Sequence, residues 1–523
     1  MAEVGSPDSR VSARPKRRFT WLWVLALLAV LVAAPHVASY LLVRRAEKRV
    51  ADAIAALPFQ LAPTGDLADT PGPAPKPEDN AAPVLSEACR MLDALLAAPA
   101  PDESSSTEEH KRASLATEFK RLQVIWGLRG PDAYPEDEAD LSPEDLRRKA
   151  VLDEFTGELM NKGQATITPE VQEAMNARGT KTPPKIPPRD VARARNFLNR
   201  FDAVWPLLDE ACRRPAYRRD GQDDPTALIN LMLLDCCLAM EERRWDAAYR
   251  RVVQAARLER LFDQEPASLG MRMATKRITI GTLPELLALH GPSQATADEL
   301  TGLLQTDVNR RLRNLVAGLC GQCYHVSARA TAGRADAADS GLTNVGASFV
   351  RWYLLVDQAV LLESMGRMAR ATELPRRESL ATIAAASDEA SNHWKLAGVP
   401  LLMTLASLPG MTMMAEEYYQ SDLYDRQLAV AVQVAAYKEA HGRCPDAISA
   451  LPRADRLPHD PYTVTRAGEA GRPFGYRVTD DGFMLWSVGP DGTDDGGKTA
   501  EELGVAPGAG GDFVLRVPPA PAP

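Results

Sequence analysis

The sequence predicts a mainly α-helical chain: a transmembrane helix, then a helical domain, then a small C-terminal α+β domain with an antiparallel sheet. Three observations predict this fold class. An uncharged apolar run lies near the start, helical periodicity covers most of the chain, and short β-rich segments lie near the end. At 523 residues the chain can form two or three domains.

The N-terminal part predicts a membrane anchor. Residues 1–18 form a basic leader, and residues 19–43 contain no Asp, Glu, Lys or Arg, which is long enough to cross a hydrocarbon core of about 30 Å. A cleavable signal peptide is the alternative, but the apolar core is too long for one and Arg44 and Arg45 follow it directly. We expect an uncleaved, single-pass anchor.

The charge distribution bears on orientation and partners. Residues 1–49 carry a formal charge of +6, and because the whole chain is −9, the remainder carries −15. Basic residues flank the span on both sides, but the short leader favours a cytoplasmic N-terminus. We therefore expect a protein of the cytoplasmic (inner) membrane with the bulk of the chain periplasmic. An acidic body argues against nucleic acid as a partner.

Between the anchor and the C-terminal domain, the sequence predicts a linker and helices. Residues 44–83 read as a short helix and a Pro-rich linker, and residues 84–424 as a helical domain. In Trp245 to Phe262, apolar side chains recur at spacings of three and four, whereas Leu228 to Met240 is apolar almost all round. These two helices predict an antiparallel hairpin, and such units suggest a solenoid.

Residues 425–517 predict the α+β domain, and residues 518–523 a Pro-rich tail. Arg426 to Ala440 has the pattern of an amphipathic helix. Three predicted strands follow at residues 474–478, 483–488 and 513–517, rich in β-branched and aromatic residues and separated by turns. We expect this domain to be a separate module.

The loop Gly489 to Glu502 fits two incompatible patterns. Gly492 to Thr499, GTDDGGKT, fits a phosphate loop, in which backbone N–H groups at a helix start bind phosphates. However, Asp494 and Asp495 would repel a triphosphate, and the Gly- and Pro-rich remainder leaves no room for a long helix. We therefore expect no nucleotide.

The other pattern is a calcium loop. Asp491, Asp495 and Glu502 occupy its positions one, five and twelve, Thr493 stands at position three, and Asp494 adds a further carboxylate. Hard cations prefer such oxygen ligands. A strand rather than a helix precedes the loop, so an EF-hand is not expected, and a solvated acidic turn stays open as the alternative.

Several motifs of the C-terminal domain occur in a fixed order: Arg426 to Asp446, Leu457 to Tyr462, Phe474 to Tyr476, Leu485 to Gly492, and Gly511 to Phe513. Together they resemble the C-terminal head of type II secretion major pseudopilins, over about 95 of the 523 residues. The resemblance implies a calcium site in the loop after the last motif strand. Asp491 is then the best ligand candidate, with Asp494 and Asp495 next.

The N-terminal part departs from that family. Pseudopilins are cut after a Gly and carry a Glu that guides fibre assembly, but here Arg18 precedes Phe19 and the Glu is missing. The whole layout resembles membrane-anchored proteins of planctomycete-type bacteria, in which a helical domain ends in such a head. This resemblance implies an architecture rather than an activity.

Other chemically suggestive residues have simpler explanations. Cys320 and Cys323 form a C-x-x-C pair, but no further ligands at suitable spacing complete a zinc site, so buried structural thiols are favoured over redox chemistry. Cys236 and Cys237 lie in an apolar run and suggest core. His441 ends a helix, where a capping role is favoured.

The sequence thus predicts a membrane-anchored scaffold or binding protein with a calcium-stabilised, pseudopilin-like head. Cell-envelope or secretion-machinery proteins are the expected partners. The alternative is an envelope hydrolase with its site in the helical domain. No catalytic residue can be named from the sequence.

Overall fold

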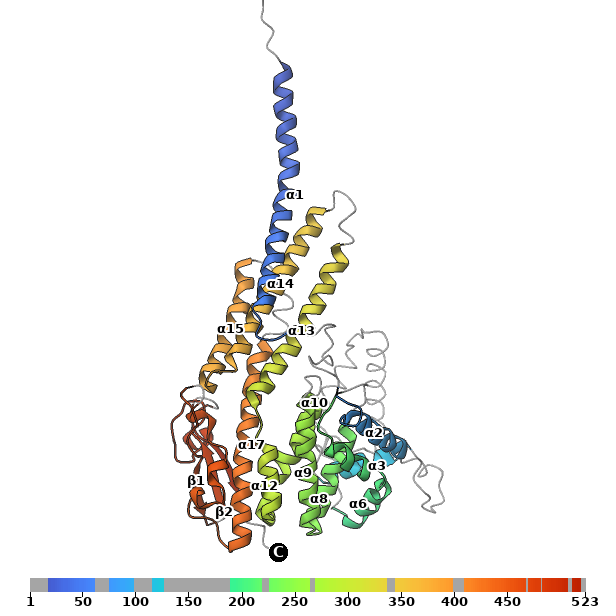
Figure 1. Ribbon diagram of the computed structural model, residues 1–523, viewed down its shortest axis with the longest axis vertical. Helices are drawn as coiled ribbons and strands as arrows, with labels where there is room; N and C mark the ends of the chain where they lie inside the picture. The colour runs from blue at the N-terminus through green and yellow to red at the C-terminus, as the bar shows by residue number, and fades with distance from the viewer. Residues whose placement is uncertain are drawn as a thin grey trace, which may run out of the picture. The chain divides into compact units, whose positions relative to one another are not determined.

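The described part of the chain is mainly helical and has one three-stranded antiparallel sheet near its C-terminal end (Figure 1), which confirms the predicted fold class at that level. The structure is a computed structural model. It describes residues 17–61, 75–97, 115–126, 189–218, 225–263, 269–335, 344–397, 409–466, 469–480, 482–506 and 510–518.

The chain divides into two compact units. Unit 1 comprises residues 1–71, 315–374 and 378–417, and unit 2 comprises residues 72–314, 375–377 and 418–523. The predicted head therefore forms one unit with about the N-terminal two-thirds of the helical domain. The predicted boundary between residues 424 and 425 falls inside the helix α17 (Pro409–His441) and does not separate two units.

Unit 1 is built on the pairing of α1 (Arg17–Ala55) with α14 (Asn344–Ala371), alongside most of α15 (Arg376–Ala397). The buried side chains of α1 follow a spacing of three and four: Val43, Ala46, Val50 and Ala53. This spacing places them on one helix face, as helix packing requires. An ion pair between Arg49 and Glu363, 2.7 Å long, joins α1 to α14.

The predicted membrane span, residues 19–43, lies within α1, and the side chains of residues 19–33 lie outside the described residues. Among helices of the described residues, none combines the length and apolarity that crossing a membrane requires. At the described end of this stretch, Val37, Tyr40 and Leu41 are more than half exposed. The span stays a prediction.

Unit 2 begins with short helices around an aromatic cluster. They are α2 (Ala82–Ala97), α3 (Leu115–Ile125), α6 (Val191–Leu198), η5 (Asn199–Phe201) and α7 (Val204–Arg213). Phe197 packs between Phe119 and Phe201, with ring centroids 5.6 and 4.9 Å away.

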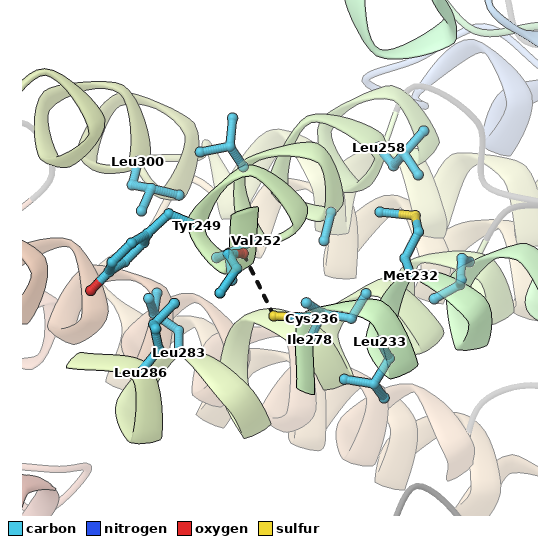
Figure 2. Packing of buried hydrophobic residues seen from close by; sticks show 14 of the residues in the cluster. Met232, Leu233, Cys236, Tyr249, Val252, Leu258, Ile278, Leu283, Leu286 and Leu300 are labelled. Carbon is cyan, nitrogen blue, oxygen red and sulfur yellow. Dashed lines mark hydrogen bonds between the residues drawn. The ribbon is translucent and has the colours of Figure 1, made fainter. Parts of the chain in front are cut away.

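The predicted hairpin is present as α8 (Thr226–Glu241) and α9 (Trp245–Phe262), which lie side by side in unit 2 (Figure 1). The tight turn between them places Arg243 in the left-handed region, with φ 57°. α8 is buried almost all round, which explains its continuous apolar sequence. In Figure 2, Val252 and Leu258 of α9 pack over Met232 and Cys236 of α8.

After α9 the chain forms α10 (Leu269–Lys276), the π-helical segment η7 (Arg277–Thr282), α11 (Leu283–Leu289) and α12 (Gln294–Leu304). Gly291-Pro292-Ser293 separates the last two, and the Ser293 hydroxyl caps α12 by accepting from the Thr296 N–H. A Cβ at Gly291 would lie 2.4 Å from the Ala435 carbonyl oxygen of α17. Only glycine allows this close approach.

The head is a sheet packed on the C-terminal part of α17. The strands β1 (Gly475–Thr479), β2 (Gly482–Ser487) and β3 (Phe513–Val517) match the predicted ones to within about a residue, in the order β1-β2-β3. Leu485 of β2 pairs with Tyr476 on one side and Leu515 on the other. Before the sheet lie η9 (Ile448–Ala450), η10 (Ala454–Arg456) and η11 (Pro461–Thr463).

The C-terminal part of α17 holds the helices of unit 2 and the head together. On one side, the Gln427 side chain donates to the Phe513 carbonyl of β3 at 2.7 Å. On the other, the Gln433 side chain donates to Thr301 and Asp298 of α12 at 2.9 and 3.2 Å. Residues of α8, α9, α17 and the sheet belong to one hydrophobic cluster. One helix therefore supplies core to both layers.

Candidate functional site

The acidic loop connects β2 to β3 in the head. Gly489 and Gly492 have φ values of 66° and 72°, a conformation that L side chains adopt at a cost. The Arg377 guanidinium lies against Gly492, in the space that a side chain there would need. These features fix the start of the loop, where Asp491 stands.

The structure brings Asp494 and Asp495 close to Asp512. The Asp512 carboxylate is buried and accepts from the Gly497 N–H at 2.6 Å and from the Asp495 N–H at 3.3 Å. Asp494 accepts from the Trp486 indole N–H at 2.9 Å and from the Gly496 N–H at 3.0 Å. The loop thus folds around the two glycines with three carboxylates near its centre.

The neighbouring carboxylates affect the pKa of Asp512. Burial raises the pKa of Asp512, and the negative charges of Asp494 and Asp495 raise it further, against the lowering effect of the Gly497 and Asp495 N–H groups. A raised carboxylate pKa means that the site disfavours its negative charge. A bound cation would relieve this repulsion.

Glu502 and Thr493, two of the five predicted ligands, make contacts within the head. Glu502 accepts from the Thr499 N–H at 2.8 Å in a capping box of α18 (Ala500–Leu503) and pairs with Arg516 at 2.6 Å. These two contacts lower the pKa of Glu502. Thr493 is exposed, and its N–H donates to the Asp491 carboxylate at 3.1 Å. Neither residue points to a metal in this arrangement.

The fit to a metal ion is therefore partial. Within the described residues, no three Asp, Glu, His or Cys side chains are grouped so that they could hold an ion together. The negative charge is present, but the ligand geometry is not formed. Asp512, which was not among the predicted ligands, is the most buried carboxylate of the loop. The motif Gly511 to Phe513 was the only sequence signal for it.

The loop does not have the architecture of a phosphate site. Thr499 caps α18, which has only four residues, whereas a phosphate loop leads into a long helix whose amino end binds the anion. Lys498 is exposed at the loop surface. That the loop binds no nucleotide stays a prediction.

Asp460 is a buried residue of the head whose role is structural. Its carboxylate accepts from the Tyr462 N–H, the Ser487 hydroxyl and the Val488 N–H at 2.9, 2.7 and 3.0 Å. These contacts connect η11 to the end of β2, directly before the acidic loop. A buried carboxylate with three donors holds its surroundings rigidly, which positions the loop.

Unit 2 also contains a buried ion network that the sequence did not reveal. The Lys276 ammonium lies 2.8 Å from Glu259 and in direct contact with Asp425, and all three side chains are at least 95% buried. Arg311 pairs with Asp263 and lies 3.6 Å from Glu259. The network joins α9 and α10, which are neighbours in sequence, to α13 (Val308–Ala335) and α17, which lie further along the chain.

The pKa values in this network follow from burial and charge. Burial raises the pKa of Asp425 to about 7 and that of Asp263 to about 6, because their basic partners offset it only in part. Burial disfavours a charged Lys276, but Asp425 and Glu259 outweigh it and raise the lysine pKa. Two carboxylates thus share one ammonium, and burial disfavours the charged form of Asp425.

A second buried ion cluster lies beside the head. Asp422 of α17 is fully buried and pairs with Arg376 and, at 2.7 Å, with Arg426. The Arg376 guanidinium also faces the Tyr419 and Tyr462 rings, 5.1 and 5.5 Å from their centroids. Burial works against the charged Asp422, but the two arginines outweigh it and lower its pKa.

The cysteine and histidine candidates have structural roles. Cys320 is buried, and burial raises its thiol pKa to about 12, so it stays protonated at neutral pH. The Cys236 thiol donates to the Ala248 carbonyl at 3.6 Å within the core (Figure 2). His441 ends α17, with its Nδ1 2.9 Å from the Tyr437 carbonyl oxygen. This position agrees with the predicted cap.

Comparisons of the chain with known protein families, with curated proteins and with solved structures gave no match.

Proposed function

We propose that this chain is a membrane-anchored scaffold or binding protein of the cell envelope, whose calcium-stabilised, pseudopilin-like head is displayed outside the cytoplasm. One observation carries the proposal: α17 contributes apolar side chains to the hydrophobic cluster that the sheet and the helices of unit 2 share. In addition, its Gln427 side chain hydrogen-bonds to β3 and its Gln433 side chain to α12. A head built into its support in this way presents its loop in a fixed orientation. Fixed presentation favours recognition of a partner.

The proposed location depends on α1. Its residues 19–43 would cross the cytoplasmic membrane, and the exposed apolar side chains Val37, Tyr40 and Leu41 suit a lipid environment. The acidic bulk of the chain would then lie in the periplasm. The proposed partners are other envelope proteins, among them components of secretion or pilus-like machinery.

Proximity labelling tests location and partners together. A biotinylating peroxidase fused after Pro523 is expected to label periplasmic envelope proteins, including secretion or pilus-like components. As a control, the same fusion without residues 1–43 should lose this pattern. If only cytoplasmic proteins are labelled, the proposed orientation is wrong. If periplasmic proteins are labelled without any secretion or pilus component, the link to that machinery is wrong.

For the head, we propose that Ca²⁺ binds at the acidic loop through Asp491, Asp494 and Asp495, close to Asp512. A ligand that binds only the folded state at one hundred times its Kd stabilises the fold by about 2.7 kcal/mol. We therefore expect millimolar calcium to raise the Tm of the full-length protein in detergent by several degrees. Differential scanning calorimetry after chelator treatment measures this shift.

Matched variants assign the effect to the loop. Asp491→Ala and Asp495→Asn should each abolish most of the calcium shift, whereas Asp446→Asn, at an exposed carboxylate elsewhere in the head, should keep it. Magnesium at the same concentration should act more weakly, because it demands stricter octahedral geometry. An equal shift in Asp491→Ala, or none in the unaltered chain, would refute the calcium site.

A further inference from the structure

Unit 2 has a pocket of about 810 Å³, distant in sequence from the acidic loop. Its walls come from the end of α7, the second half of α9, the end of α12 and the first turns of α13. A volume of this size lies within the range of small-molecule sites, roughly 300–1,000 Å³. The proposed function makes no use of this pocket.

The pocket is strongly basic. Six arginines line it: Arg213, Arg214, Arg257, Arg260, Arg310 and Arg311. Two lining residues, Asp263 and Asp307, are acidic, and Glu210 and Glu299 outside the lining pair with Arg213, Arg214 and Arg257. The arginine content is notable because the whole chain carries a net charge of −9. The lining of the pocket is therefore rich in arginine within a chain that is acidic as a whole.

Some of the arginines are held rigidly. Arg214 donates to the carbonyls of Pro77 and Asn80 at 2.8 and 2.9 Å and pairs with Glu210 at 3.2 Å. Arg311, which is buried, is held by Asp263 and belongs to the ion network described above. Their guanidinium groups give the pocket a fixed positive wall, so a ligand would not have to order them.

Two other arginines are available to a ligand. Arg260 of α9 and Arg310 of α13 are exposed, and within the part of the chain that the structure describes, neither guanidinium has an ion-pair partner. Side chains three residues apart share a helix face, so Arg260 stands beside Arg257 on α9. The two available groups thus reach the pocket from different helices.

Further features of the rim point to a ligand. The hydroxyl oxygen of Thr306, which lines the pocket, is buried, and in the described residues it has no hydrogen-bond partner. A buried hydroxyl normally has one. Thr306 precedes α13, at whose amino end the Asp307 carboxylate accepts from the Arg310 N–H at 3.0 Å. A bound oxyanion could accept from the Thr306 hydroxyl.

We infer that this pocket binds a small anion with two or more oxyanion groups. Guanidinium groups match the geometry of phosphate and carboxylate oxygens, and several of them converge here. The net negative charge of the chain disfavours a long polyanion that extends beyond the pocket. Phosphate and carboxylate ligands share the chemistry, and separate probes distinguish them.

The test is calorimetric titration of the full-length protein in detergent, in calcium-free buffer, with pyrophosphate and with citrate as probes. At least one probe is expected to bind with a Kd below a millimolar, whereas acetate at equal ionic strength should not. Binding of pyrophosphate alone would identify a phosphorylated ligand, and binding of citrate alone a polycarboxylate. If neither binds, the inference is wrong.

Single variants locate the binding. Arg260→Ala and Arg310→Ala should each weaken binding about tenfold or more, because each removes a charge-assisted hydrogen-bond donor. Arg250→Ala is the matched control, since Arg250 is exposed on the same helix α9 but does not line the pocket. All three should keep the circular dichroism spectrum and the calcium response. An equal loss in Arg250→Ala would refute the site.

Discussion

Lys276→Met is expected to lower the free energy of unfolding by about 3–5 kcal/mol, as removal of one partner from a buried ion pair does. The substitution keeps the side-chain volume but leaves Glu259 and Asp425 close together without the shared ammonium. Urea denaturation of the full-length protein, followed by circular dichroism, measures the loss in the transition of unit 2.

The loss should depend on pH in a defined direction. Burial raises the pKa of Asp425 from about 3.8 to about 7 in the fold. An acid with a raised folded pKa contributes stability that is fully present below its unfolded pKa and is lost as pH rises through the folded pKa. At pH 5 the Asp425 carboxyl is largely protonated and does not repel Glu259, so the loss of the Lys276 ammonium matters less. The Lys276→Met variant should therefore be less destabilised at pH 5 than at pH 8.

The control for this prediction is Asp425→Asn. It removes one of the two carboxylates but leaves Lys276 paired with Glu259, so it should cost far less than Lys276→Met and should reduce the pH dependence between about pH 4 and 7. If Asp425→Asn proves as destabilising as Lys276→Met at every pH, the two carboxylates do not compete for one lysine.

Asp422→Ala is expected to have an effect of similar size, about 3–5 kcal/mol. It leaves Arg376 buried without its carboxylate, beside the Tyr419 carbonyl and the Tyr419 and Tyr462 rings. Removal of one half of a buried pair costs more than the pair itself contributes, because the remaining charge is unpaired. Equilibrium denaturation again measures the change.

The pH dependence of this pair has the opposite sign. The arginines lower the pKa of Asp422, so its contribution is present above its unfolded pKa, about 3.8, and is lost as pH falls through the lowered folded value. The variant and the unaltered chain should converge only in strong acid. Asp446→Asn, which breaks an exposed pair with Arg443, should change stability by less than about 1 kcal/mol.

Much of the fold could be predicted because local patterns decide it. The boundaries of α9 and the three strands follow from apolar periodicity and turn residues, and they hold to within about a residue. α17 was expected from Arg426, yet it begins at Pro409. The sequence before Arg426 contains several polar residues, among them Asp422 and Asp425. These two carboxylates fit into a packed helix because each has a buried basic partner, which the sequence does not show.

The candidate site was predictable only in part. The acidic loop was found because its carboxylates are close in sequence, but Glu502 turned out to cap α18 and to pair with Arg516. Asp512 was missed as a loop carboxylate because it is ten residues further along the chain than Glu502. Closeness in sequence did not decide which carboxylates meet.

By itself, the sequence determined the helical character, the hairpin of α8 and α9, and the strands of the head, since each depends on side chains within one or two turns of a helix or along one strand. Only the tertiary structure decided which charges meet. Lys276 and Asp425 form an ion pair although they come from helices that are distant in the chain. Arg260 and Arg310 line one pocket but belong to different helices. Electrostatic interactions depend on distance in space and on burial, and neither is encoded in the spacing of residues.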